Sequence, residues 1–177
     1  TMDKQLWNSE EFKLLKNYVF IEVDIDKNTS LARKYGITSI PRVIVEVANN
    51  QKDVLIDKSG FRSKNQHLGE LQYINQFDLK EVYLSNNESE YGNAYRNLFL
   101  SDRKKSYTTL LKLSSKHFKK ALKKEKNTIN QLNIIYNLKL KGSSKKANKN
   151  LEKLKLDKAN LSEIENEIIQ KIITNSI

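Results

Sequence analysis

The chain contains a single proline, Pro41, which lies within the first of two regions with different residue patterns. Pro41 stands directly before RVIVEV (42–47), the most β-prone run of the sequence. Because proline has no N–H donor, it is tolerated at the first residue of a strand but not inside a central one. No proline follows Pro41, so no residue of that kind interrupts a helix in the rest of the chain. We therefore expect helices and strands around Pro41 and a helical region after it.

The residues up to position 77 alternate between strand-like and helix-like segments. Three runs rich in β-branched residues predict strands, the first of them covered on both faces and the other two joined as a hairpin: YVFIEVD (18–24), RVIVEV (42–47) and KDVLIDKSG (52–60). Three further runs predict helices: SEEFKLLKN (9–17), LARKYG (31–36) and SKNQHLGELQYINQF (63–77). This alternation is typical of an α/β domain, in which helices flank a sheet.

The region after residue 90 has the pattern of successive amphipathic helices. Three segments predict helices: DRKKSYTTLLKLSSKHFKKALKK (102–124), INQLNIIYNLKLKG (129–142) and SSKKANKNLEKL (143–154). Capping boxes are expected at Thr128–Gln131 and at Ser162–Glu165, and the second of these opens a final helix. Short helices with short links predict a helical-hairpin bundle or a tetratricopeptide-like array. The absence of a clear repeat of about 34 residues favours the bundle.

Composition excludes several classes of protein. No cysteine is present, so these residues provide no disulfide and no thiolate nucleophile. No run of about 18 apolar residues predicts a membrane-spanning helix, and the first residues lack the apolar core of a signal peptide. The charge is uneven, because residues 1–80 carry 12 basic and 11 acidic side chains whereas residues 81–177 carry 20 and 10. The change in charge coincides with the change in pattern, which supports two regions.

The basic excess is concentrated in residues 103–126, which hold ten basic side chains and one acidic one. Lys112, Lys116, Lys119 and Lys123 are spaced three or four residues apart and so share one face of a helix. The simplest interpretation is a solvated helix face. If this face binds a partner, we favour an acidic protein or peptide. Nucleic acid, which would be held through phosphate contacts, is the less favoured alternative.

No other motif indicates a catalytic, metal or cofactor site. His67 and His117 lie in separate predicted helices, and neither has a cysteine or a second histidine at metal-ligand spacing, so surface or helix-face roles are expected. Asp24 and Asp26 are explained by the end of a strand and the start of a helix. No glycine-rich phosphate-binding loop occurs. We therefore predict neither a metal nor a cofactor, and we expect Trp7 to cover the sheet.

The first region resembles the thioredoxin-like family. The resemblance rests on VDIDKNTSLARKYGITSIPRVIVEV (23–47) and on GF at 60–61, with about ten motif positions in the order and spacing of the family. It implies that Pro41 is a cis-proline beside the active site and that the backbone of Ile40 pairs with an extended substrate chain. Arg42 departs from the small residue usual after this proline, and it either adds charge near the substrate groove or points to solvent. Ile40, Pro41 and Arg42 are thus the predicted substrate-binding residues.

A second departure is the missing C-x-x-C motif. In the family, the strand that leads into this motif lies between the strands that correspond to 18–24 and 42–47. Without it, both segments would bury unpaired backbone groups, at roughly 1–3 kcal/mol for each group. We therefore expect about 30–50 residues, a strand–helix–strand unit, to precede Thr1. The alternative is that another chain donates the strand.

These observations predict a thioredoxin-like α/β domain over residues 1–77, a linker over 78–90 and an all-helical bundle over 91–177. The function implied by the resemblance is a thiol-disulfide oxidoreductase or isomerase that acts on protein thiols or disulfide-containing polypeptides, with its catalytic C-x-x-C outside these residues. The implied compartment is the periplasm or another extracytoplasmic space, with the cytoplasm as the alternative. The competing hypothesis is a redox-inactive binding or assembly module that uses its basic helical half for protein partners.

Overall fold

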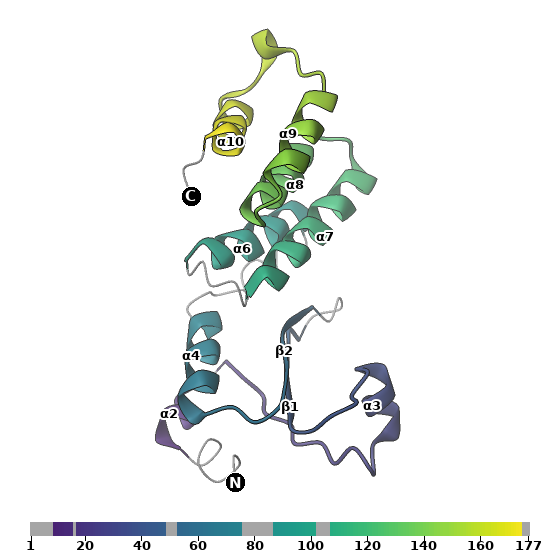
Figure 1. Ribbon diagram of the computed structural model, residues 1–177, viewed down its shortest axis with the longest axis vertical. Helices are drawn as coiled ribbons and strands as arrows, with labels where there is room; N and C mark the ends of the chain where they lie inside the picture. Colours follow the sequence, from purple (N-terminus) through teal and green to yellow (C-terminus); the bar gives the residue numbers. More distant parts are fainter. Residues whose placement is uncertain (1–8, 16, 49–52, 76–86, 102–106, 175–177) are drawn as a thin grey trace. The chain divides into compact units, whose positions relative to one another are not determined.

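The computed structural model describes residues 9–15, 17–48, 53–75, 87–101 and 107–174 (Figure 1). The chain divides into two compact units, Thr1–Asp78 and Leu79–Ile177. The described residues contain eight α-helices and one sheet, which has two antiparallel strands. Helices therefore dominate the described residues taken together, and each unit is considered separately below.

The first unit is built around a β-hairpin. Its elements are α2 (Glu10–Lys13), α3 (Thr29–Lys34), β1 (Arg42–Glu46), β2 (Val54–Ser59) and α4 (Lys64–Asn75). The strands pair Arg42 with Ser59 at one end and Glu46 with Val54 at the other, with an irregularity between Val45 and Glu46. At the open end of the hairpin, the Gly60 N–H donates to the Pro41 carbonyl over 2.8 Å. Pro41 thus begins the hairpin from a position at which it needs to donate no hydrogen bond.

The core of the first unit is small. Phe12, Leu15, Leu68 and Leu71 form one buried cluster, and the side chains of Tyr18 and Val45 pack against it. These contacts join α2, α4 and the hairpin. The sequence pattern predicted the inward-facing side of α4 correctly, since Leu68 and Leu71 are both buried.

The predicted fold class is wrong. The structure has no thioredoxin-like sheet with flanking helices in its described residues, where β1 and β2 are the only paired strands. Residues 18–24, which were expected to form a central strand, belong to no strand. The physical reason is that β-propensity describes how well side chains fit a packed, paired sheet, so it produces a strand only where a neighbouring strand is available.

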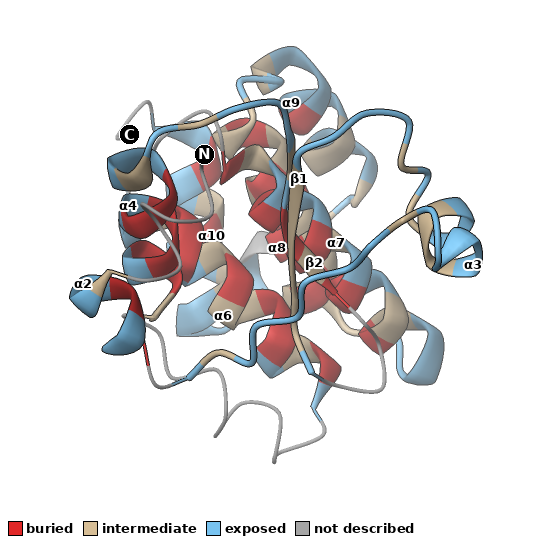
Figure 2. Ribbon diagram, turned by 90° about the horizontal axis from the view of Figure 1, so that it is seen from below, coloured by how far each residue is buried: buried red, intermediate tan, exposed pale blue. Residues whose placement is uncertain are grey.

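The second unit is a stack of antiparallel helices. It contains α6 (Glu88–Ser101), α7 (Thr108–Lys124), α8 (Thr128–Leu140), α9 (Ser144–Lys153), a 3-10 helix η2 (Lys158–Asn160) and α10 (Glu163–Ile173). Consecutive helices from α6 to α9 pack against one another, and α10 returns to pack against α8 and α9. In Figure 2, α6, α7 and α8 carry extensive buried faces, whereas α3 of the first unit is mostly exposed.

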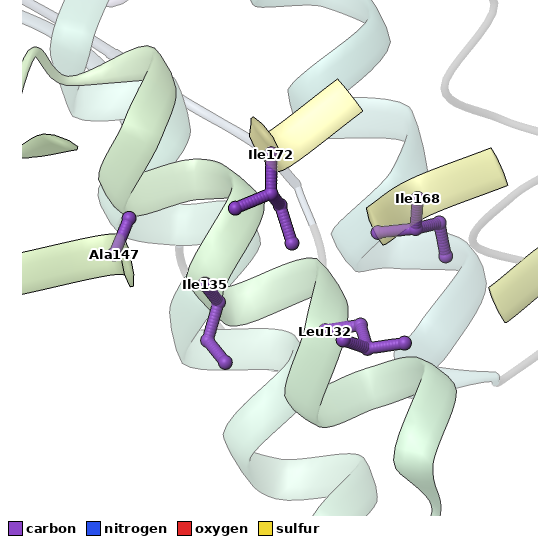
Figure 3. Close-up of a cluster of buried hydrophobic side chains, with 5 residues drawn as sticks. All are labelled: Leu132, Ile135, Ala147, Ile168 and Ile172. Atoms are coloured by element: carbon purple, nitrogen blue, oxygen red, sulfur yellow. The ribbon is translucent and has the colours of Figure 1, made fainter. Parts of the chain in front are cut away.

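Apolar side chains fill the interior of this stack. Leu132 and Ile135 of α8, Ala147 of α9, and Ile168 and Ile172 of α10 form one cluster (Figure 3). Between α6 and α7 the contact is close at Gly92, where an added Cβ would lie 2.7 Å from a ring carbon of Phe118. The absence of a side chain at Gly92 therefore allows these two helices to approach each other.

The ends of the helices correct two predictions and confirm a third. Ser162 and Glu165 form the expected reciprocal capping box at the start of α10. The box expected at Thr128 is wrong, because Asn127 caps α8 and its side chain accepts from the Asn130 N–H. Residues 87–90 of the predicted linker do not form a linker, since α6 begins at Glu88. The part of that linker up to 86 lies outside the described residues, as does Trp7.

Candidate functional site

The three residues predicted to bind substrate lie where the chain enters β1. The peptide bond between Ile40 and Pro41 is cis. The side chain of Ile40 is 68% exposed, so it presents an apolar surface to solvent. No observation on the described residues tests their role, and substrate binding by Ile40, Pro41 and Arg42 stays a prediction.

Arg42 has a structural role that the sequence did not predict. Its Nε and Nη2 atoms donate to the two carboxylate oxygens of Asp57 over 2.6 and 2.7 Å, and its Nη1 donates to the Gly36 carbonyl over 2.8 Å. The guanidinium thereby links β1 to β2 and to Gly36, which follows α3. Hydrogen bonding to Arg42 lowers the pKa of Asp57. The charge of Arg42 is therefore already paired within the hairpin.

A groove along α7 gathers lysine side chains on the described surface. This groove has a volume of about 530 Å³ and is lined by Ser115 and six lysines: Lys112, Lys116, Lys119, Lys120, Lys123 and Lys141. Among the described residues, none of those that line it is acidic. We call this feature the α7 groove.

The local sequence explains why the lysines gather there. Lys112, Lys116, Lys119 and Lys123 recur every three or four residues, which places them on one side of α7, and Lys120 lies next to Lys119 at the edge of that side. The opposite side carries Leu111, Ser114 and Phe118, all fully buried. Lys141 joins the groove from a different element, because it follows the last residue of α8 and caps that helix. A cation at this position also interacts favourably with the negative end of the α8 dipole.

The electrostatics of the α7 groove favour an anion. The pKa of Lys141 is lowered, first by burial and then by the charges of Lys112 and Lys119. A bound negative group would relieve the repulsion among these ammonium groups. Lysine presents a compact, mobile charge and has no planar fork for bidentate recognition, so the groove offers point charges to carboxylate and phosphate groups alike.

A second pocket, of about 430 Å³, is lined by the ends of α6, α7 and α8 and contains charges of both signs, including Glu88, Lys124 and Glu125. Here Ser89 Oγ donates to Asn130 Oδ1 over 3.0 Å. Glu88 is also bound internally, since its Oε2 lies 2.6 Å from Nδ1 of the fully buried His117. These polar groups satisfy one another, so the pocket is best explained as part of the packing between helices.

Buried polar side chains of α6, α7 and α8 bond to one another and to the backbone. Ser114 Oγ donates to the Gly92 carbonyl over 2.6 Å, while Asn137 Nδ2 donates to Ser114 Oγ over 2.8 Å. Arg96 donates to the side-chain oxygens of Asn93 and Asn133, and burial lowers its pKa to about 10. Ser114 thus serves helix packing and has no hydrogen bond to a histidine among the described residues. These bonds link α6, α7 and α8.

Sequence reasoning missed one lysine of the groove. His67 and His117 lie in separate helices, α4 and α7, as predicted, and both are buried, so of the two expected roles the surface one does not apply. No group of three or more metal-ligating side chains occurs in the described part of the chain. Lys141 could not be assigned to the groove from helical spacing, because it approaches from α8. Its position just before Gly142, at the end of a predicted helix, was the available signal.

The chain matches no known family model, no curated protein and no solved structure at a significant level. The resemblance to thioredoxin-like proteins therefore stays a prediction. None of the described helices has both the length and the apolar character needed to cross a membrane.

Proposed function

We propose that this chain is a protein-binding module that holds an acidic polypeptide segment in the α7 groove. The observation that carries the proposal is that six lysines, five on α7 and one directly after α8, line a single groove, and that no described residue lining this groove is acidic. Carboxylates in that groove would pair with ammonium groups that otherwise repel one another. The second unit then acts as a rigid helical scaffold for this surface.

The dimensions of the groove suit a short acidic segment. Lys112 and Lys123 are eleven positions apart on α7, and at about 1.5 Å per residue this separation is roughly 16 Å. An extended peptide advances about 3.3 Å per residue, so about five residues would run along the groove. Alternate acidic side chains of such a segment could each reach a lysine.

Nucleic acid fits the α7 groove less well. Single strands are held by basic grooves that also supply aromatic rings for base stacking, and base recognition relies mainly on bidentate side chains. The described residues that line the α7 groove include neither an aromatic ring nor an arginine. The groove therefore offers charge but no means to hold a base.

The test uses the full 177-residue chain and a fluorescent peptide of eight glutamates with blocked ends. The groove variant carries Lys112→Glu, Lys119→Glu and Lys123→Glu. A matched control carries Lys145→Glu, Lys146→Glu and Lys149→Glu, three exposed lysines of α9 that do not line the groove. We expect the groove variant to lose at least about tenfold in affinity, or 1.4 kcal/mol, because three charge pairs become repulsive. We expect the control to lose less than about threefold.

Equal losses in the two variants would contradict the proposal, since net charge alone would then explain binding. A twelve-residue oligothymidine that binds more tightly than the peptide at the same salt concentration would point to nucleic acid instead. The thiol-disulfide activity implied by the resemblance stays a prediction. These 177 residues contain no cysteine to which a thiolate role could be assigned.

A further inference from the structure

Arg96 of α6 is a half-buried cation that has only neutral partners. Its Nη1 donates to Asn133 Oδ1 of α8, and its Nη2 donates to Asn93 Oδ1 over 2.7 Å. Its guanidinium carbon lies 5.4 Å from the ring centroid of Phe118 and 5.3 Å from that of Tyr136. No carboxylate among the described residues bonds to it. These contacts hold the side chain in place but leave its charge without a counter-ion.

A charge in this position needs compensation. Burial disfavours the charged form and lowers the pKa of Arg96 to about 10, so the side chain is still protonated at neutral pH. Charged side chains that are removed from water are normally paired. Two arginines of the first unit follow this rule, since Arg42 binds Asp57 and Arg62 binds Glu70. Arg96 differs from both, because its hydrogen bonds go to asparagine oxygens alone.

The hydrogen bonds around Arg96 leave donors and no acceptors for a ligand. A guanidinium can only donate, so each asparagine turns its oxygen toward Arg96 and its amide nitrogen away. Neither Asn93 Nδ2 nor Asn133 Nδ2 bonds to a described residue. Beyond its two engaged N–H groups, Arg96 retains the Nε–H and one N–H on each Nη.

These free donors are open to solvent. In the part of the chain that the structure describes, the side-chain polar atoms that are enclosed and unbonded are His67 Nε2 and Asn137 Oδ1. The Nε of Arg96 and the two amide nitrogens are therefore not sealed within the protein, and a ligand can reach them. A positive charge surrounded by accessible donors is complementary to an anion.

We propose that Arg96, Asn93 and Asn133 form a binding site for one carboxylate group. The planar fork of a guanidinium matches the two oxygens of a carboxylate, and the neighbouring amide N–H groups are further donors for the same anion. A single cation neutralises a carboxylate, whereas a phosphate dianion would keep an uncompensated charge. None of the three residues lines the α7 groove, so the proposal goes beyond the proposed function and does not depend on it.

The test uses the full 177-residue chain and three short peptides. The first is an acetylated tetra-alanine with a free C-terminus, the second an acetylated and amidated tripeptide with a central glutamate between alanines, and the third an acetylated and amidated tetra-alanine without any carboxylate. The NMR resonance of the Arg96 Nε–H reports binding. We expect at least one carboxylate peptide to shift this resonance and to bind at least about tenfold more tightly than the third peptide. The tighter of the two identifies a chain terminus or an acidic side chain as the source.

A variant provides a second test. Asn93→Asp is nearly isosteric, keeps an oxygen that faces Arg96 and places a negative charge beside it. We expect at least about a tenfold loss of peptide affinity and a thermal midpoint higher by roughly 4 °C or more, because the enclosed charge gains a counter-ion. Asn97→Asp is the matched control, since Asn97 is exposed on the same helix and, one position from Arg96, points in a different direction. It should change the affinity less than about threefold.

Three outcomes would overturn the proposal. The first is equal binding of all three peptides, or binding of none at millimolar concentration. The second is an Asn93→Asp variant with unchanged affinity. The third is a large loss of affinity in the variant that carries Lys112→Glu, Lys119→Glu and Lys123→Glu, because the peptide would then occupy the α7 groove. We expect that variant to bind the single-carboxylate peptides normally, so failure here is separable from failure of the proposed function.

Discussion

The two units differ in how completely each one buries its own apolar residues. In the second unit, Tyr95, Phe118, Leu132 and Ile172 are fully buried. In the first unit, Val19 and Ile21 are 88% and 79% exposed. Helices satisfy their backbone within the segment and need only one apolar face covered, whereas strands need a neighbour that can be distant in sequence. Neighbouring helices along the chain can therefore bury each other's apolar faces, whereas a sheet needs strands that can come from distant parts of the sequence.

The largest expected effect comes from truncating each core. Leu132→Ala in the second unit and Leu71→Ala in the first should each lower the free energy of unfolding by about 2–5 kcal/mol, through lost burial and the cavity left behind. Hydrogen exchange measured residue by residue would locate each loss. We expect Leu132→Ala to weaken protection in α8 and α10 and leave α4 unchanged. Equal loss of protection in both units would break the comparison, because the chain would then unfold as one cooperative body.

A matched pair of glycine substitutions gives the next effect. Gly92→Ala places a Cβ against the ring of the buried Phe118 and should destabilise the second unit by about 1–3 kcal/mol. Gly69→Ala in α4 meets no atom within 4 Å and should stabilise the first unit by about 0.5–1 kcal/mol through better helix propensity. Thermal unfolding followed by circular dichroism measures both. A stabilising Gly92→Ala would show that the α6–α7 contact can widen without cost.

The smallest effect is a pH dependence of the first unit. Burial, followed by the charge of Arg62, lowers the pKa of His67. Below about pH 6.5, His67 is therefore protonated in the unfolded chain more readily than in the folded unit. Each unit of difference between the two pKa values lowers the free energy of unfolding by up to about 1.4 kcal/mol. Stability should be complete above that pH and fall as the pH decreases through the folded pKa. His67→Phe should remove this slope, and denaturant titrations at pH 7.5 and 5.5 would show whether it does.

The sequence predicted the helical unit better than the sheet. The segment 102–124 contains α7, and the capping box at Ser162 marks the start of α10 correctly. Both depend on signals within about one helical turn. Helix α6 was missed, although Tyr91, Tyr95 and Leu98 follow a helical period. Gly92 interrupts this apolar pattern. Its lack of a side chain leaves room for the ring of Phe118 on α7, and this contact between two helices cannot be inferred from the sequence around Gly92.

The hairpin was also anticipated, since RVIVEV and KDVLIDKSG contain β1 and β2. The conformation of YVFIEVD (18–24) was predicted incorrectly. Its residues favour a strand, but no neighbouring strand for it occurs in the part of the chain that the structure describes. For the candidate site, the spacing of Lys112, Lys116, Lys119 and Lys123 predicted a basic face. The groove itself could not be predicted, since Lys141 reaches it through the packing of α8 on α7.

The construction of the α7 groove from lysine also has a chemical consequence. An arginine keeps its charge under all physiological conditions, whereas an amine can be acylated and then carries none. The charge of the groove can therefore be reduced one side chain at a time. The lowered pKa of Lys141 leaves more of its amine in the neutral, nucleophilic form at a given pH. Acylation of successive lysines would lower the positive charge of the groove in steps without changing the fold.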